Sequence, residues 1–139
     1  MNTSQLVTDS QSRVSSLARW VLILSGLVYL LAGLALIFAP YWFFLQIGHF
    51  VPFNRHYAGD AGTFSLPIGI GAFIAARAPG KNLGLTGMVA LASVSHWMNH
   101  CYDWILDGTT LNRFVTDVLP LGIQASSVVV VLTLLLRIK

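Results

Sequence analysis

The sequence predicts an all-α fold, a four-helix transmembrane bundle of up-down topology with both termini in the cytoplasm. Three observations predict it. Of the 139 residues, 55% are hydrophobic and only 9% are charged, whereas about a quarter of a typical soluble domain is charged. Four apolar stretches, at approximately residues 20–39, 54–76, 83–104 and 115–136, are long enough to cross a bilayer. Lysine and arginine are unequally divided between the two ends of these stretches.

The composition limits the classes of partner that the chain can have. The mean hydropathy is +0.72, and the chain contains no glutamate, so its net charge of +3 reflects a shortage of acids. No basic patch indicates nucleic-acid binding, and the lipid bilayer is the expected partner. The single cysteine, Cys101, excludes an internal disulfide.

The first span follows a polar segment. Residues 1–16 are rich in Ser, Thr and Gln and lack an apolar period, which predicts a disordered or surface-lying tail ahead of a transmembrane domain at residues 17–139. Residues 20–39 are uncharged and reach about 30 Å as a helix, which favours a span over a signal peptide with its apolar core of about 7–15 residues. The aromatic residues that follow predict a belt at the membrane interface, namely Tyr41, Trp42, Phe43, Phe44, Phe50 and Phe53.

The remaining spans have recognisable ends. Asn54 is the predicted N-cap of the second span. A tight Pro-Gly turn at residues 79–80 makes the second and third spans antiparallel neighbours. Thr116 or Asp117 is the predicted cap of the last span, with Pro120 tolerated in its first turn.

The positive charges set the orientation. With four spans, one side carries Arg13, Arg19, Arg77, Lys81, Arg137 and Lys139, and the other side carries only Arg55 and Arg113. Since lysine and arginine concentrate on the cytoplasmic side, both termini are predicted there. The expected location is the cytoplasmic (inner) membrane, as a multi-pass protein.

The third span ends in the polar run SHWMNHCYDW at residues 95–104. On a helix, His96, His100 and Asp103 stand at i, i+4 and i+7 on one face, with Asn99 beside them. Ionisable residues in a membrane span are costly, so they mark a functional site by default.

The second span offers matching groups, because His56 and Asp60 are also four residues apart. If the second and third spans fold about Pro79 with equal rise, His56 lies level with Asp103 and Asp60 lies level with His100. The predicted metal-binding or polar cluster is His56, Asp60, His96, His100 and Asp103. The residues predicted to support it are Asn54, Arg55, Thr63, Asn99, Asp117 and Gln124.

Three interpretations of this cluster remain open. Imidazole and carboxylate are ligands of a transition metal such as zinc, copper or iron, and imidazoles from two facing helices can hold a haem. The same groups can instead form a hydrogen-bond clamp between helices, or a path for protons or a small solute. Trp97 follows His96 where the helical zinc-protease motif requires glutamate. The residues do not decide between an enzyme and an accessory membrane subunit.

The segments NRHYAGDAG and HWMNHCYDW resemble those of small four-span bacterial membrane proteins of the DoxX-like type, from about Pro40 onward. The resemblance implies a four-helix bundle in the cytoplasmic membrane and a redox or quinone-linked role. The matching polar positions are Asn54, Arg55, His56, Asp60, His96, His100 and Asp103.

Glycines recur at a spacing of seven residues in the first two spans. Gly26 and Gly33 share one face of the first, and Gly62 and Gly69 share one face of the second. Small residues let helix backbones approach closely in membranes. Either face is therefore a candidate contact for a homo-oligomer or for a larger membrane complex.

Overall fold

The computed structural model describes residues 2–138, which are almost entirely helical and contain no strand. Met1 of the predicted tail and Lys139, counted in the charge bias, lie outside them. The long helices are α1 (Thr3–Phe38), α3 (Arg55–Arg77), α4 (Leu83–Leu106) and α6 (Leu119–Arg137). The short segments are α2 (Pro40–Phe43), a π-helical turn (Phe44–Gly48), a 3₁₀ turn (Pro79–Lys81), α5 (Leu111–Arg113) and a second π-helical turn (Phe114–Val118).

Three of these segments are long and apolar enough to cross a membrane, namely Thr8–Phe38, Arg55–Arg77 and Leu111–Arg137. They identify a membrane protein with several spans. The 24-residue α4 is not among them, because polar side chains occupy its C-terminal half from Ser95 onward.

Helix α1 corrects one of the two alternatives predicted for the tail, the disordered one. It runs without a break from Thr3 through the polar segment into the first span, for 36 residues in all. Extending an existing helix costs far less free energy than starting one. Polar residues of modest helix propensity can therefore continue the apolar helix that follows them. The side-chain amide of Gln11 donates to the carbonyl of Ile138 at 3.0 Å, tying this extension to the C-terminal end.

Helix α3 begins as predicted. The side chain of Asn54 accepts a hydrogen bond from the backbone N–H of Tyr57 at 3.1 Å, which confirms it as the N-cap. The turn between α3 and α4 is also confirmed, as a 3₁₀ turn at Pro79–Lys81.

The last span begins earlier than predicted. The chain is helical from Leu111, and Thr116 and Asp117 lie inside the second π-helical turn, so neither is a cap. Pro120 lacks an N–H, and its ring would clash with the carbonyl of Thr116 in a regular α-helix. A π turn places one extra residue at this point, which relieves the clash and lets the helix continue.

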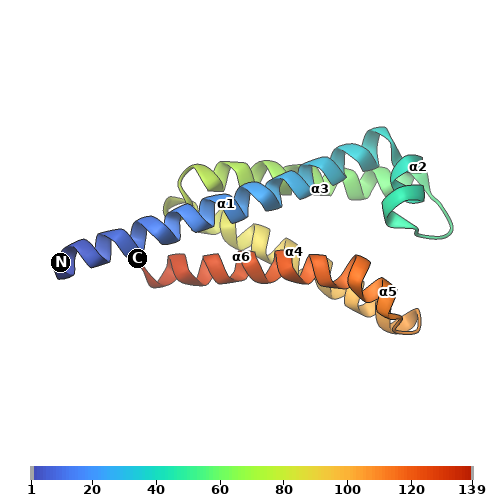
Figure 1. Ribbon diagram of the computed structural model, residues 1–139. Coiled ribbons are helices and arrows are strands. Elements are labelled where there is room, and N and C mark those ends of the chain that lie inside the picture. Colours follow the sequence, from blue (N-terminus) through green and yellow to red (C-terminus); the bar gives the residue numbers. More distant parts are fainter. Residues whose placement is uncertain (1, 139) are drawn as a thin grey trace.

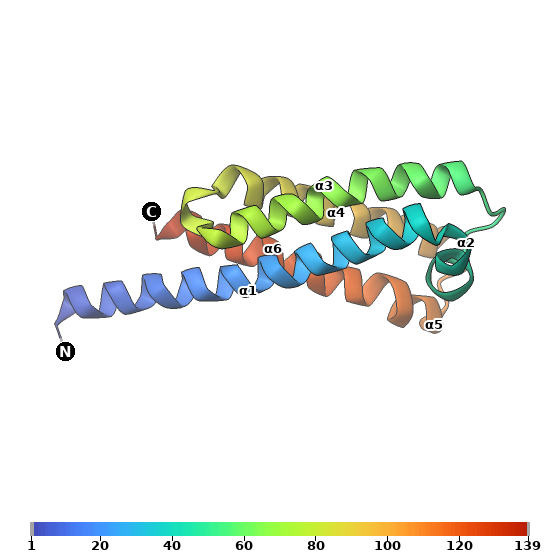
Figure 2. The same ribbon diagram turned by 90° about the horizontal axis from the view of Figure 1, so that it is seen from above.

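The long helices form two pairs, α1 with α3 and α4 with α6. Figure 1 shows both described chain ends at one end of the molecule, the termini end, and α2 and α5 at the opposite, far end. All four helices meet in the termini half, where Leu22 packs with Ala72, Val89 and Val128. Toward the far end the two pairs separate (Figure 1), and in Figure 2 α3 lies over α4.

The glycine faces meet each other inside the chain. A Cβ added to Gly69 would lie 2.9 Å from the carbonyl oxygen of Gly26, and one added to Gly62 would lie 2.8 Å from that of Gly33. These glycines therefore hold α1 against α3, and the contact they were expected to offer a second copy is occupied within the chain.

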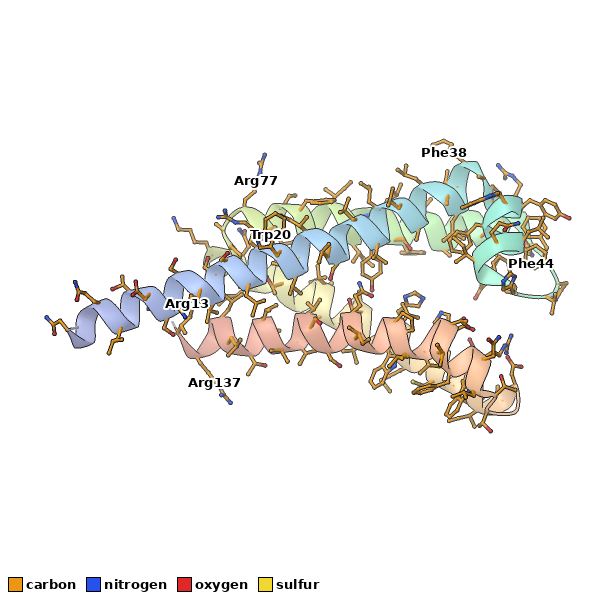
Figure 3. All side chains as sticks on the ribbon, in the orientation of Figure 1. Arg13, Trp20, Phe38, Phe44, Arg77 and Arg137 are labelled. Carbon is orange, nitrogen blue, oxygen red and sulfur yellow. The ribbon has the colours of Figure 1, made fainter. Side chains whose placement is uncertain are left out.

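The aromatic residues after α1 form a cluster at the far end. The ring centroids of Phe44 and Phe53 are 5.2 Å apart, and those of Tyr41 and Phe53 are 5.3 Å apart. Phe50 joins the same group, 5.3 Å from Phe44. Figure 3 shows Phe38 and Phe44 at this end, whereas Arg13, Arg77 and Arg137 lie toward the termini end.

Candidate functional site

The predicted site residues lie in the far half of the molecule, on two different helix pairs. His56 and Asp60 stand near the start of α3, which packs along α1. His96, His100 and Asp103 stand near the end of α4, which packs along α6. Figure 1 shows these parts of α3 and α4 on opposite sides of the gap between the pairs.

On α3, the pair formed by His56 and Asp60 faces outward. Its Nε2 and Oδ2 atoms are 3.5 Å apart, and the side chains are 89% and 57% exposed. Such an exposed pair contributes little to stability, because water screens it and both side chains lose freedom. No contact among the described residues holds these two groups toward α4.

On α4, the predicted shared face of His96 and His100 is confirmed. Their Nε2 atoms are 3.1 Å apart, and the rings meet edge to face with centroids 4.8 Å apart. Asp103 does not join them, because its Oδ2 accepts a hydrogen bond from the side-chain amide of Asn99 at 3.0 Å.

The structure thus divides the five residues among three local contacts, each within one helix: His56 with Asp60, His96 with His100, and Asp103 with Asn99. No group of three or more His, Cys, Asp or Glu side chains suited to one metal ion occurs within residues 2–138. His56 would lie level with Asp103, and Asp60 with His100, only if α3 and α4 ran side by side for their whole length. Instead the glycine contact draws α3 onto α1, and no residue of α4 after Ser93 is buried.

A contact that the sequence reasoning missed lies next to this pair. The hydroxyl of Tyr29 on α1 donates to Oγ of Ser93 on α4 at 3.2 Å, and the two residues are 6% and 2% exposed. The Tyr29 ring also lies 6.4 Å from the ring of His96. The sequence feature that could have indicated this contact is a tyrosine in the middle of an apolar span, because a buried tyrosine hydroxyl usually has a hydrogen-bond partner.

The supporting residues have mostly local roles. Thr63 donates to the carbonyl of Asp60 at 2.8 Å on its own helix, and Asp117 accepts from the hydroxyl of Thr116. Arg55 is exposed at the start of α3. None of these three bonds to the histidines of α4 in the described structure.

Gln124 is different, because its Nε2 is buried and has no hydrogen-bond partner among the described residues. A Cβ added to Gly122 would lie 2.9 Å from Nε1 of Trp97, a contact that sets the register of α4 against α6. In antiparallel helices with this register, Gln124 lies within about one residue of the level of His96. An unpartnered amide therefore lies on the neighbouring helix at the level of the histidine pair.

No protein-family model, curated protein or solved structure matches the chain. The chemistry of the site is therefore read from its own residues. Two imidazoles converge on one face of α4, with a buried hydroxyl pair one turn away. These groups can accept and donate hydrogen bonds or coordinate an electrophilic ion.

Proposed function

We propose that this protein crosses the cytoplasmic membrane four times, with α4 as the fourth span and both termini in the cytoplasm. The 24 residues of α4 extend about 36 Å, enough to cross the hydrocarbon core. Both described chain ends lie at one end of the molecule (Figure 1), as an even number of spans requires. Arg13, Arg77 and Arg137 gather toward that end (Figure 3), and such residues concentrate on the cytoplasmic side.

Cysteine labelling tests this topology. In a Cys101→Ser background, a cysteine in place of Gly80 is expected to resist a membrane-impermeant maleimide in intact cells, and one in place of Gly108 is expected to react. Both glycines lie in turns, and an added Cβ meets nothing within 4 Å at either position. The φ of Gly108 is +92°, so cysteine strains the backbone there, in an exposed turn between α4 and α5. Labelling of the Gly80→Cys variant from outside would refute the topology, and labelling of both after lysis is the control.

Within this topology, the α4 histidine pair is the proposed binding site for a redox-linked ligand: a metal ion, a haem or a quinone. The observation that carries the proposal is that His96 and His100 pair with each other, whereas no bond from either to α3 occurs within residues 2–138. A clamp between α3 and α4 requires hydrogen bonds from one helix to the other. A ligand site instead requires side chains that are not engaged in such bonds. The resemblance to DoxX-like membrane proteins is in keeping with such a role.

The second candidate is an accessory subunit in which polar contacts only hold the helices together. The observation that favours it is the buried hydrogen bond from Tyr29 to Ser93, which joins α1 to α4. Such bonds contribute about 0.6 kcal/mol on average between membrane helices. They need no ligand.

Analysis of protein purified without chelator separates the two candidates. The measurements are elemental analysis, an optical spectrum and extraction of bound quinone. A ligand site predicts a copurifying metal, haem or quinone that is lost in His96→Gln and His100→Gln variants and retained in His49→Gln. His49 is the matched control because it ends the first π-helical turn and belongs to neither α3 nor α4. Wild-type protein that carries none of the three would favour the accessory subunit.

A further inference from the structure

The histidine pair of α4 has the geometry of a chelate. His96 and His100 are one helical turn apart, and their Nε2 atoms are 3.1 Å from each other. His96 is exposed and His100 is half-buried, so the pair is accessible at the surface of the chain. Asp103 is engaged with Asn99 and leaves the two imidazoles as the available ligands on this face.

Metal–nitrogen bonds of about 2.0–2.1 Å set the separation that two imidazoles need on one ion. An angle of 90° at the metal places the nitrogens about 2.9 Å apart, and a tetrahedral angle places them about 3.4 Å apart. The separation in the structure, 3.1 Å, lies between these limits. The pair can therefore hold an ion in two adjacent coordination positions without a change in the helix.

The same distance argues against a haem held by both residues. Two imidazoles that bind opposite faces of a haem iron are separated by two metal–nitrogen bonds, about 4 Å, with the macrocycle between them. Residues four apart on one helix point in the same direction. His96 and His100 are placed for adjacent positions on an ion and not for opposite ones.

We propose that His96 and His100 form a bidentate chelate for a divalent late transition metal, with Cu²⁺ bound most tightly. Imidazole suits this group of metals, and affinity rises along the series to copper. Because no third protein ligand accompanies the pair within residues 2–138, water or an external ligand fills the remaining positions. This inference rests on the ligand site proposed above and names its ligand.

Without a metal, one imidazole donates its Nε2–H to the Nε2 of the other. When the ion binds, the donor changes to its Nδ1–H tautomer, so that both Nε2 lone pairs face the metal. No net proton is released in this exchange, and no oxidant or reductant is needed. Binding is a ligand exchange in which water leaves the ion.

Titration of the full chain with CuCl₂ tests the chelate. Protein in detergent is stripped with a chelator, desalted and titrated against a competing colorimetric chelator, and the bound Cu²⁺ is examined by electron paramagnetic resonance. We expect one ion per chain, with hyperfine coupling to two nitrogens. His96→Gln and His100→Gln should each weaken binding at least about tenfold, because even residues that only support metal ligands are worth about 10–100-fold.

Two controls make the test specific. His56→Gln removes a histidine from α3 and should leave the affinity unchanged. A His100→Gln/Cys101→His double variant keeps the number of histidines but turns the second imidazole about 100° around the helix, so it should bind as weakly as His100→Gln. Size-exclusion elution and helicity identify variants that fail to fold.

The outcomes distinguish this inference from the proposed function. Wild-type affinity in both single variants, or in the double variant, would overturn the chelate. A histidine-dependent quinone or haem in protein that does not bind Cu²⁺ would also overturn it, while leaving the proposed ligand site in place. Histidine-dependent Cu²⁺ binding by protein that purifies without any ligand would support the chelate and the ligand site, and would count only against the redox-linked role proposed for that site.

Discussion

Alanine in place of Gly69 is expected to destabilise the folded protein, whereas alanine in place of Gly87 is expected to leave it unchanged or slightly more stable. In a helix interior, alanine is normally favoured over glycine by about 1 kcal/mol. At Gly69 the added Cβ would lie 2.8 Å from the backbone nitrogen of Leu30 and 2.9 Å from the carbonyl oxygen of Gly26. At Gly87 it meets nothing within 4 Å.

Alanine is therefore expected to lower the stability of the protein at Gly69 and to maintain or raise it at Gly87. The contacts at Gly69 are with backbone atoms, which move only if α1 and α3 separate, and overpacking of this kind costs about 1–3 kcal/mol. Gly62→Ala is expected to behave in the same way, because its Cβ would lie 2.8 Å from the carbonyl oxygen of Gly33.

Thermal unfolding in detergent, followed by tryptophan fluorescence and by the loss of monodisperse protein, measures these effects. The expected order of stability is Gly87→Ala at or above wild type, then Gly62→Ala and Gly69→Ala below it. Equal melting temperatures for Gly69→Ala and Gly87→Ala would show that α1 and α3 do not pack through their glycines.

The second large effect is expected at Leu22. This side chain is fully buried, at 0% exposure, where α1 meets Ala72 of α3, Val89 of α4 and Val128 of α6. Leu22→Ala should cost at least about 2 kcal/mol, the lower end of the range for such truncations. The lower end applies because lipid is as apolar as leucine, so lost packing dominates the cost.

Leu24→Ala is the matched control on the same helix. Leu24 is 61% exposed and faces lipid in the proposed topology, so its truncation exchanges one apolar contact for another. Its effect on reversible unfolding in mixed micelles should be within about 0.5 kcal/mol, as for other substitutions away from packed sites. Equal losses at the two positions would contradict the packing of α1 in the four-helix core.

Features that depend on neighbours along the chain were predictable from the sequence. The helical class, the cap at Asn54, the turn at residues 79–80 and the shared face of His96 and His100 follow from hydropathy, local hydrogen bonding and the 3.6-residue period. All of these are present in the structure. The start of the last span was missed because a π turn relieves the clash of Pro120, a local alternative that the usual cap signals do not indicate.

Which helices pair was decided only in the tertiary structure. Two glycine faces and a short turn were visible in the sequence, but the sequence did not show that α3 would use its glycines on α1 and separate from α4 at the far end. That choice divides the predicted cluster, leaving His56 and Asp60 on one pair and His96 and His100 on the other. The physical reason is that close backbone contact favours the approach of α1 and α3 along their length. The polar side chains of the predicted cluster are already paired within their own helices, so they provide little attraction to draw α3 toward α4.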